Sequence, residues 1–367
     1  SLNDVKVVEV YFENLLLLMR AKVLLNGGSL ARTKLTWLYP SSMIQSRRNK
    51  MGESWERLFK KYFNAGDAPK SLSESVAPFY YFNKREGIAA GQHSAISIDI
   101  GGETTDVVIY LDDKPSLLTS FRFAANAVFG DFHGRATAIN GFVCKYKNIL
   151  EEKGLGSRFS FQNIERSEDI ISYLFSIEKS DGLKKEGKDF SFNKLLMADE
   201  DFRIVFLLFY TSIIYHIAQI LKSKDIKAPA YVTLSGTGSK IVDLAEGSST
   251  LTAVTEITQL IFTKLLEREK PVKLEIKKVS NPKEISCIGA LLRDDNIISI
   301  NDVTVLSGSD KNEFSLRYSD ITEDVERDVI IHYEDFIRFF FSLNNEFNYR
   351  NKFDLNPALF SRYREYL

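Results

Sequence analysis

A strand, a pair of glycines and a second strand lie near the first third of the chain and constrain its fold most. Residues 97–110 read SIDIGGETTDVVIY. Apolar residues alternate with Ser97 and Asp99 before the glycines, and a β-branched run, Val107–Ile109, follows them. This pattern predicts two strands joined by a tight turn.

The residues of this turn also suggest a binding site. Gly101 and Gly102 lack a Cβ atom, so a ligand can approach their backbone closely. Successive N–H groups in such a turn form a nest for anions, and the hydroxyls of Thr104 and Thr105 add donors. Asp99 is placed to hold a divalent metal through water or to orient an attacking water. The local pattern fits equally a β-hairpin whose glycines serve only the turn.

A second glycine turn stands more than a hundred residues downstream. Residues 230–241, AYVTLSGTGSKI, predict a strand, a glycine turn and the start of a helix. Phosphate or ribose groups can approach Gly236 and Gly238, although a single GxG turn is weak evidence.

Three motifs together resemble those of one superfamily. DIGGETTDV resembles the second phosphate motif of the actin-like ATPases (actin, DnaK-type chaperones, sugar kinases) and is most similar to its form in bacterial actin homologues. LSGTGSKI is similar to their adenosine motif, and Glu74–Ala77 to the element in which a Glu follows a strand and opens a helix. The resemblance covers about residues 30–292. It implies an α/β fold of ribonuclease H-like, actin-type lobes, with a mixed sheet flanked by helices and an incomplete first lobe.

The resemblance implies ATP and Mg²⁺ as ligands. It assigns Asp99 to the metal and, with Glu74, to the catalytic water. The residues that it places near the nucleotide are Gly101, Gly102, Thr104, Thr105, Gly130, Asp131, Gly236, Thr237, Gly238, Ser239 and Lys240. Of these, the glycine–acid pair Gly130–Asp131 is expected near the phosphates, and Ser239 and Lys240 are expected to face the base.

Two departures from the family pattern limit the prediction. No Asp-x-Gly hairpin precedes residue 30, so we expect the chain to be the C-terminal part of a longer protein that lacks the first phosphate motif. Glu103 stands in the turn where relatives often have Gly. Its carboxylate would repel a triphosphate unless it points away or contacts magnesium.

The chain divides into three predicted regions. Residues 1–95 correspond to the later half of the first lobe, and residues 96–292 to the second lobe, whose variable upper subdomain covers about 145–200. Residues 293–367 are expected to form a β-element and an aromatic helix that pack on the first lobe or on a partner.

Composition restricts the functional classes. Forty-eight basic residues against 49 acidic ones give no support for nucleic-acid binding through a broad basic face. Two cysteines exclude a disulfide framework and fit a reducing compartment, so a cytoplasmic location is expected, with Cys287 as a small buried hydrophobe. Residues 204–221 carry no formal charge and approach the length of a membrane span, but their polar side chains favour a buried helix over a span.

The leading hypothesis is a nucleotide-binding, slowly ATP-hydrolysing protein in which the lobes close on the nucleotide. It would be an ATPase if the full protein carries the upstream phosphate hairpin. The alternatives are a non-catalytic scaffold or nucleotide sensor of the same fold, and a small-molecule kinase of the same superfamily. The expected partners are the nucleotide and either a second copy of the chain or another protein, whose binding would depend on the closure of the lobes.

Overall fold

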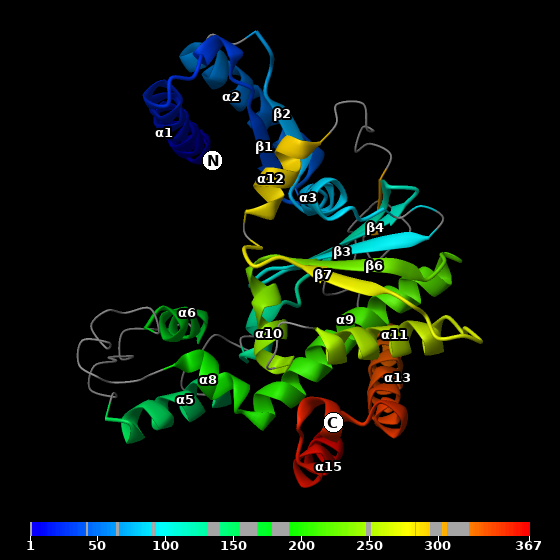
Figure 1. The fold of residues 1–367 in the computed structure, drawn as a ribbon. Coiled ribbons are helices and arrows are strands. Elements are labelled where there is room, and N and C mark those ends of the chain that lie inside the picture. The colour runs from blue at the N-terminus through cyan, green and yellow to red at the C-terminus, as the bar shows by residue number, and fades with distance from the viewer. Residues whose placement is uncertain are drawn as a thin grey trace.

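The computed structural model describes most of the chain. The described residues are 2–41, 43–63, 66–89, 91, 93–130, 140–154, 167–177, 191–246, 251–282, 284–293, 303–306 and 323–367. They form a small N-terminal sheet, a larger mixed sheet and surrounding helices (Figure 1).

The N-terminal part is an α/β unit with a short sheet. Its elements are α1 (Leu2–Leu25), the 3₁₀ turn η1 (Leu30–Arg32), β1 (Thr36–Tyr39), α2 (Gln45–Phe63), β2 (Lys70–Ser73) and α3 (Ala77–Glu86). Strands β1 and β2 pair in parallel. Helix α1 packs on α2, with the ring of Phe12 stacked on Trp55 at a centroid distance of 4.2 Å.

The larger sheet holds the predicted hairpin at its centre. Its strands are β3 (Ser94–Ile100), β4 (Thr105–Leu111), β5 (Lys114–Phe121), β6 (Pro229–Ser235), β7 (Glu275–Lys278) and β8 (Thr304–Val305), in the order β7-β6-β3-β4-β5-β8. The pairs β3–β4 and β4–β5 are antiparallel, and β3–β6, β6–β7 and β5–β8 are parallel. The prediction of an α/β fold with a mixed sheet flanked by helices is confirmed.

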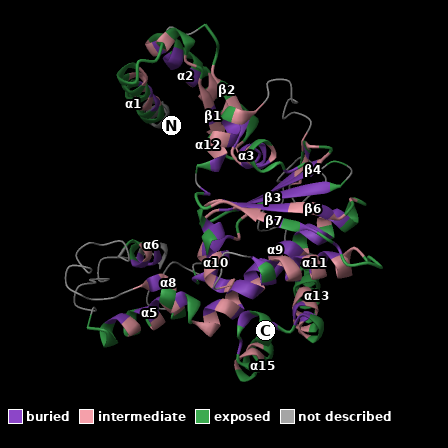
Figure 2. Ribbon diagram, in the orientation of Figure 1, coloured by how far each residue is buried: buried purple, intermediate pink, exposed green. Residues whose placement is uncertain are grey.

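Helices cover both faces of this sheet, so its central strands are buried (Figure 2). The remaining helical elements are α4 (Ala125–Val128), α5 (Gly141–Glu152), α6 (Ser167–Ile177), α8 (Phe192–Met197), α9 (Glu200–Ser223), η4 (Thr237–Ser239), α10 (Lys240–Glu246), α11 (Thr252–Leu265), α12 (Ile285–Leu292), α13 (Glu323–Phe347), α14 (Tyr349–Phe353) and α15 (Pro357–Tyr366). One face packs on the core of α9 and α11, and the other on α3 and α12. On the second face, Phe79 stacks on Tyr110 at 3.6 Å.

Helix α9 contains residues 204–221, the uncharged segment that is nearly long enough to span a membrane. By length and composition it is the one described helix that could cross a membrane. In the fold it lies under the sheet, and residues such as Phe206, Leu207 and Ile214 are fully buried. The prediction of a buried core helix is therefore confirmed.

The C-terminal region packs on the larger sheet and its helices. Helix α13 contacts α9 and α11, where Phe336 and Phe339 lie 5.4 and 5.2 Å from the ring of Tyr215. Strand β8 extends the larger sheet beside β5. The aromatic helix was expected on the first lobe or on a partner; within the described chain α13 packs on α9 and α11, because its phenylalanines meet Tyr215 on the outer side of α9.

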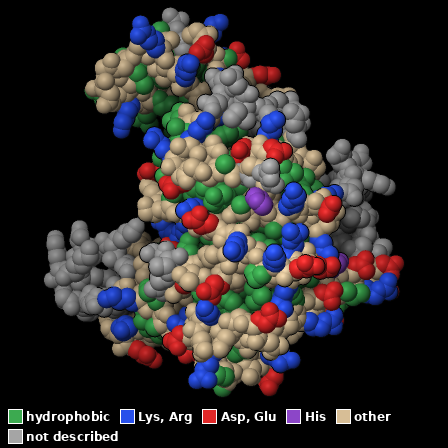
Figure 3. Space-filling view, turned by 45° about the vertical axis from the view of Figure 1, so that its right-hand side comes forward, with side chains coloured by type: hydrophobic (Ala, Val, Ile, Leu, Met, Phe, Trp, Pro, Cys, Tyr) green, Lys and Arg blue, Asp and Glu red, His purple; other side chains and the backbone are tan. Residues whose placement is uncertain are grey.

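The charged surface agrees with the balanced composition. On the face shown in Figure 3, basic and acidic side chains are interspersed rather than gathered by sign.

Helix α12 joins the N-terminal part through a very close contact with α3. A Cβ atom on Gly289 would lie 2.0 Å from the carbonyl oxygen of Ala77. Helix α12 therefore connects residues that follow β7 of the larger sheet with the N-terminal part.

We expect Gly289→Ala to lower the free energy of unfolding by about 2 kcal/mol, because the new methyl group must displace backbone atoms of α3. Urea denaturation followed by circular dichroism measures this change. Gly52→Ala is the matched control within α2, because its Cβ would meet only a Trp37 ring atom at 3.7 Å. That control should be neutral or stabilise by up to about 1 kcal/mol, and equal effects of the two substitutions would contradict the expectation.

Candidate functional site

The two predicted glycine turns lie side by side at one edge of the larger sheet. Strand β3 pairs in parallel with β6, with Asp99 opposite Ser235, so both strands end at the same edge. A Cβ atom on Gly238 would lie 2.4 Å from the carbonyl oxygen of Gly101, and one on Gly236 would lie 2.3 Å from Asp99 Oδ1. Glycine is therefore required at both positions by the contact between the turns themselves.

A cavity of about 300 Å³ opens on one side of these turns, and we call it the carboxylate cavity. Three acidic side chains line it together with both turns. Its lining residues are Leu38, Glu74, Asp99, Gly101, Thr104, Asp106, Gly236, Thr237, Pro282, Ser286 and Cys287. The cavity therefore joins the end of the larger sheet to Glu74, which follows β2, and to α12.

Burial and neighbouring negative charge raise the pKa of two of the carboxylates in this cavity. Burial, then the charge of Asp106, raises the pKa of Asp99 to about 6, although a hydrogen bond from Ser235 acts in the opposite direction and the charge of Glu74 adds a smaller increase. Burial and the charge of Asp106 also raise the pKa of Glu74. A group with a pKa near 6 exchanges protons readily at neutral pH.

A chain of serine hydroxyls connects Asp106 to the N-terminal sheet. The Ser75 hydroxyl donates to Asp106 Oδ2 at 2.7 Å. Ser75 also bonds to the Ser41 hydroxyl, which lies 2.7 Å from the Ser73 hydroxyl. These contacts fix the turn that carries Glu74 relative to the start of β4.

A larger cavity of about 700 Å³ lies on the other side of the glycine turns, and we call it the α10 cavity. Its walls are apolar side chains of α6 and α10, with polar groups at the rim. Its lining residues are Gly102, Ala125, Asn126, Phe129, Ile171, Ser172, Phe175, Asn193, Thr237, Gly238, Lys240, Ile241, Asp243, Leu244, Lys278 and Ser280. Thr237 lines both cavities, so they meet at the second glycine turn.

The carboxylates do not form a ready-made chelating site. Within the part of the chain that the structure describes, no three His, Cys, Asp or Glu side chains converge on a point that could hold a metal ion. Mg²⁺ usually keeps several waters and binds through one or two carboxylates plus phosphate oxygens of a ligand. Asp99 and Asp106 suit that second mode.

The structure brings most of the predicted site residues to the two cavities. Asp99, Glu74, Gly101, Thr104 and Gly236 line the carboxylate cavity; Gly102, Gly238 and Lys240 line the α10 cavity; and Thr237 lines both.

Three predicted contacts are corrected. Thr105 is fully buried and its hydroxyl donates to the carbonyl of Phe123 at 2.7 Å, so it has no donor left for a phosphate. Ser239 is also fully buried, and its hydroxyl donates to Gly236 O at 2.8 Å within η4 rather than facing a base. Gly130 lines neither cavity; its positive φ of 80° turns the chain next to Asn140. Asp131 lies outside the described residues.

The sequence reasoning missed several residues of the site. Asp106 is the most important of them, and the register of the hairpin could have revealed it, because Asp99 and Asp106 are directly paired across β3 and β4. Lys278 and Asp243, which form an ion pair in the lining of the α10 cavity, come from β7 and α10 and carry no local signal. The prediction that Cys287 is buried is wrong, since it is exposed at the carboxylate cavity.

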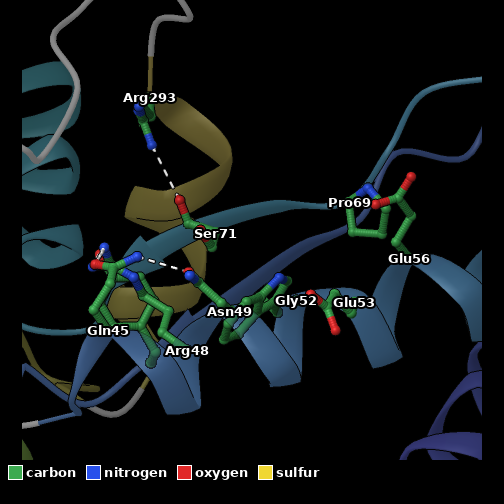
Figure 4. Close-up of a pocket in the computed structure, with 11 residues that line it drawn as sticks. Gln45, Arg48, Asn49, Gly52, Glu53, Glu56, Pro69, Ser71 and Arg293 are labelled. Atoms are coloured by element: carbon green, nitrogen blue, oxygen red, sulfur yellow. Dashed lines mark hydrogen bonds between the residues drawn. The ribbon is translucent and has the colours of Figure 1, made fainter.

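A third cavity, of about 550 Å³, lies on the N-terminal part between α2, the outer edge of β2 and the end of α12. Figure 4 shows Arg293 donating to the carbonyl of Ser71 on that edge, with Gln45, Arg48 and Asn49 from α2 opposite. None of the predicted site residues lies there, so the candidate site remains at the glycine turns.

Comparisons with known proteins find similarity to solved structures at low identity. No protein-family model matches the sequence, and no curated protein matches it. Among solved structures, the ethanolamine utilization protein EutJ from Carboxydothermus hydrogenoformans is similar with 15% identity and a TM-score of 0.35, over 78% of this chain and 75% of that one. The archaeal actin homologue Ta0583 is similar with 13% identity and a TM-score of 0.41, over 74% and 73%.

A type IV pilus biogenesis complex, PilM–PilN, contains a further similar chain, with 15% identity and a TM-score of 0.34 over 66% of this chain and 58% of that one. The chain is thus similar in structure to actin-like proteins at low identity. At such scores, its function has to be inferred from its own residues.

We expect Asp99→Asn to stabilise the fold at pH 7.5 and to have little effect at pH 4. The pKa of Asp99 in the fold, about 6, lies above its usual value of 3.8, so the native state loses stability as pH rises through this interval. Removing the charge should restore about 2–3 kcal/mol above pH 6. Thermal denaturation across this pH range measures it. Glu103→Gln, in the exposed part of the same turn, is the control and should leave the pH profile unchanged.

Proposed function

We propose that this chain binds ATP with Mg²⁺ at the two glycine turns and, with its carboxylates, hydrolyses it slowly. The observation that carries the proposal is the pair of cavities that meet at Thr237, one lined by three carboxylates and the other by apolar side chains and lysines. A nucleotide has the same two-part chemistry, with a charged polyphosphate and a flat, largely apolar base.

The polyphosphate would lie in the carboxylate cavity against the first turn. Gly101 and Thr104 of that turn line the cavity, and their backbone and hydroxyl groups would meet phosphate oxygens. Because Glu74, Asp99 and Asp106 would repel a bare triphosphate, the proposal requires the metal. Mg²⁺ would be held by waters, by Asp99 and by the phosphates themselves.

The nucleoside would occupy the α10 cavity. Its volume of about 700 Å³ lies within the range usual for small-molecule sites. Ile171 and Phe175 of α6 and Leu244 of α10 offer apolar surface for a base. Lys240 and Lys278 lie at the same cavity; Lys278 pairs with Asp243, and Lys240 would favour the negative charge of the α-phosphate.

Hydrolysis would proceed by in-line attack of water on the γ-phosphorus. Metal and backbone donors would stabilise the charge that develops on the phosphoryl oxygens. Asp99 and Glu74 would orient the water, and the raised pKa of Asp99, about 6, suits a group that accepts a proton near neutral pH. Closure of the N-terminal part on the nucleotide would be the output.

A nucleotide sensor without turnover is the second candidate. Two observations favour it. The described residues form no cluster of three metal-ligating side chains. Of the described N-terminal part, which has a two-stranded sheet, only Leu38 and Glu74 line the carboxylate cavity. Binding and turnover must therefore be measured separately.

We expect isothermal titration calorimetry to detect binding of ATP in the presence of Mg²⁺ and to lose it when the metal is chelated. Thr237→Tyr should weaken binding by at least about tenfold, because an exposed side chain at the junction of the two cavities would become bulky enough to block it. Thr304→Tyr, an equally exposed threonine on β8, is the control and should bind normally. Absence of binding in the unmodified chain would refute the nucleotide proposal.

Phosphate release separates the ATPase from the sensor. We expect Asp99→Asn and Glu74→Gln each to reduce the rate by about 10²-fold or more while changing the affinity for ATP less than about threefold. Cys287→Ser, at the same cavity but without a carboxylate, serves as the control. Tight binding without measurable phosphate release would support the sensor instead.

A further inference from the structure

Helix α1 carries two apolar faces, of which only one has a partner within the described chain. On the inner face, Phe12 and Leu16 are buried against α2, with exposed fractions of 5% and 0%. The polar side chains beside them are engaged with α2 as well: Glu9 pairs with Arg57, and Glu13 with Lys61. These contacts fix which side of α1 faces outward.

The outward side is apolar and uncharged over three helical repeats. Seven large side chains on it are between 43% and 86% exposed: Val7, Val10, Tyr11, Leu17, Leu18, Leu24 and Leu25. Exposed Asn14 and Ala21 complete the row. Figure 2 shows α1 at the outer margin of the molecule, with much of its surface exposed. We call these nine residues the α1 stripe.

The spacing of the α1 stripe is that of a coiled coil. Its members recur every seven residues, as 7, 14 and 21, as 10, 17 and 24, and as 11, 18 and 25. In heptad notation these are positions a, d and e, the positions by which one helix packs against another. The partner chemistry is therefore an apolar helix with the same repeat.

Asn14 points to a second copy of this chain as that helix. It occupies the middle one of the three a positions, and a single polar residue at such a position favours pairing with an identical residue across the interface and fixes the register. A membrane surface fits less well, because helices that lie on membranes carry Lys and Arg on their polar face. On α1 that face carries Glu9, Glu13 and Arg20, and all three are engaged with α2: the acids pair with Arg57 and Lys61, and Arg20 donates to the carbonyl of Tyr62.

We propose that the α1 stripe is a homodimer interface, in which α1 of one copy packs on α1 of the other with Asn14 facing Asn14. Burying roughly 100 Å² from each of the seven apolar side chains on both copies removes on the order of 1,400 Å² from water, within the range of stable interfaces. The pairing is isologous and is independent of nucleotide.

The oligomeric state of the 367-residue chain tests the proposal first. Light scattering over a concentration series up to roughly 100 µM should give twice the monomer mass. Leu18→Glu should weaken dimerisation by about 100-fold, because it puts a charge into the centre of an apolar contact. Leu291→Glu is the matched control, since Leu291 is 75% exposed on α12 and Leu18 is 69% exposed on α1. Both variants should keep the melting temperature of the monomer.

Cross-linking tests the register. In a Cys144→Ser, Cys287→Ser background, Asn14→Cys should form an intermolecular disulfide rapidly under mild oxidation. Lys22→Cys, which is exposed on α1 but outside the stripe, should not. Three outcomes would each overturn the proposal: a chain that stays monomeric at every concentration, a dimer that Leu18→Glu does not weaken, or equal cross-linking at positions 14 and 22. In each case another protein or another segment of the chain would have to cover the stripe.

Discussion

The parallel pairing of β3 with β6 is the interaction on which the candidate site depends. It joins two strands that are more than a hundred residues apart and ends them at the same edge of the sheet. The contact is so close that neither Gly236 nor Gly238 could carry a side chain without displacing backbone atoms of the first turn. Both cavities exist because the two turns abut there and leave space on either side.

Acidic side chains gather at this edge of the sheet, and the hydrogen bonds described above bring no positively charged side chain to them. Asp99 and Asp106 face each other across β3 and β4, and like charges in that position destabilise a strand pair. Among the hydrogen bonds described above, the hydroxyls of Ser75 and Ser235 stabilise the negative charges of Asp106 and Asp99, and both hydroxyls are neutral. A polar cluster that costs stability and lies in a cavity is typical of a functional site.

Local patterns in the sequence predicted the elements well. Alternation of apolar and polar residues, followed by a β-branched run, marked the hairpin of β3 and β4, as observed. These signals depend on each residue's near neighbours, so one sequence suffices to find them. The glycines of both turns could be identified for the same reason.

Tertiary placement could not be predicted in the same way. Whether the Thr105 and Ser239 hydroxyls face a ligand or a carbonyl depends on where Phe123 and Gly236 lie, and the sequence is silent on that. The positions of α13 on α9 and of α12 on α3 likewise depend on matching surfaces from distant segments. Lys278 reaches the α10 cavity only because β7 pairs with β6.

The short helix α12 has a mechanical consequence. Ser286 and Cys287 lie near its start and line the carboxylate cavity. Arg293 lies at its end and lines the third cavity, beside β2. Between them, Gly289 is pressed against the backbone of α3 so closely that the two helices cannot slide past each other independently. Helices α3 and α12 are thus packed as one unit, and its ends at the carboxylate cavity and beside β2 lie about 12 Å apart along the axis of α12.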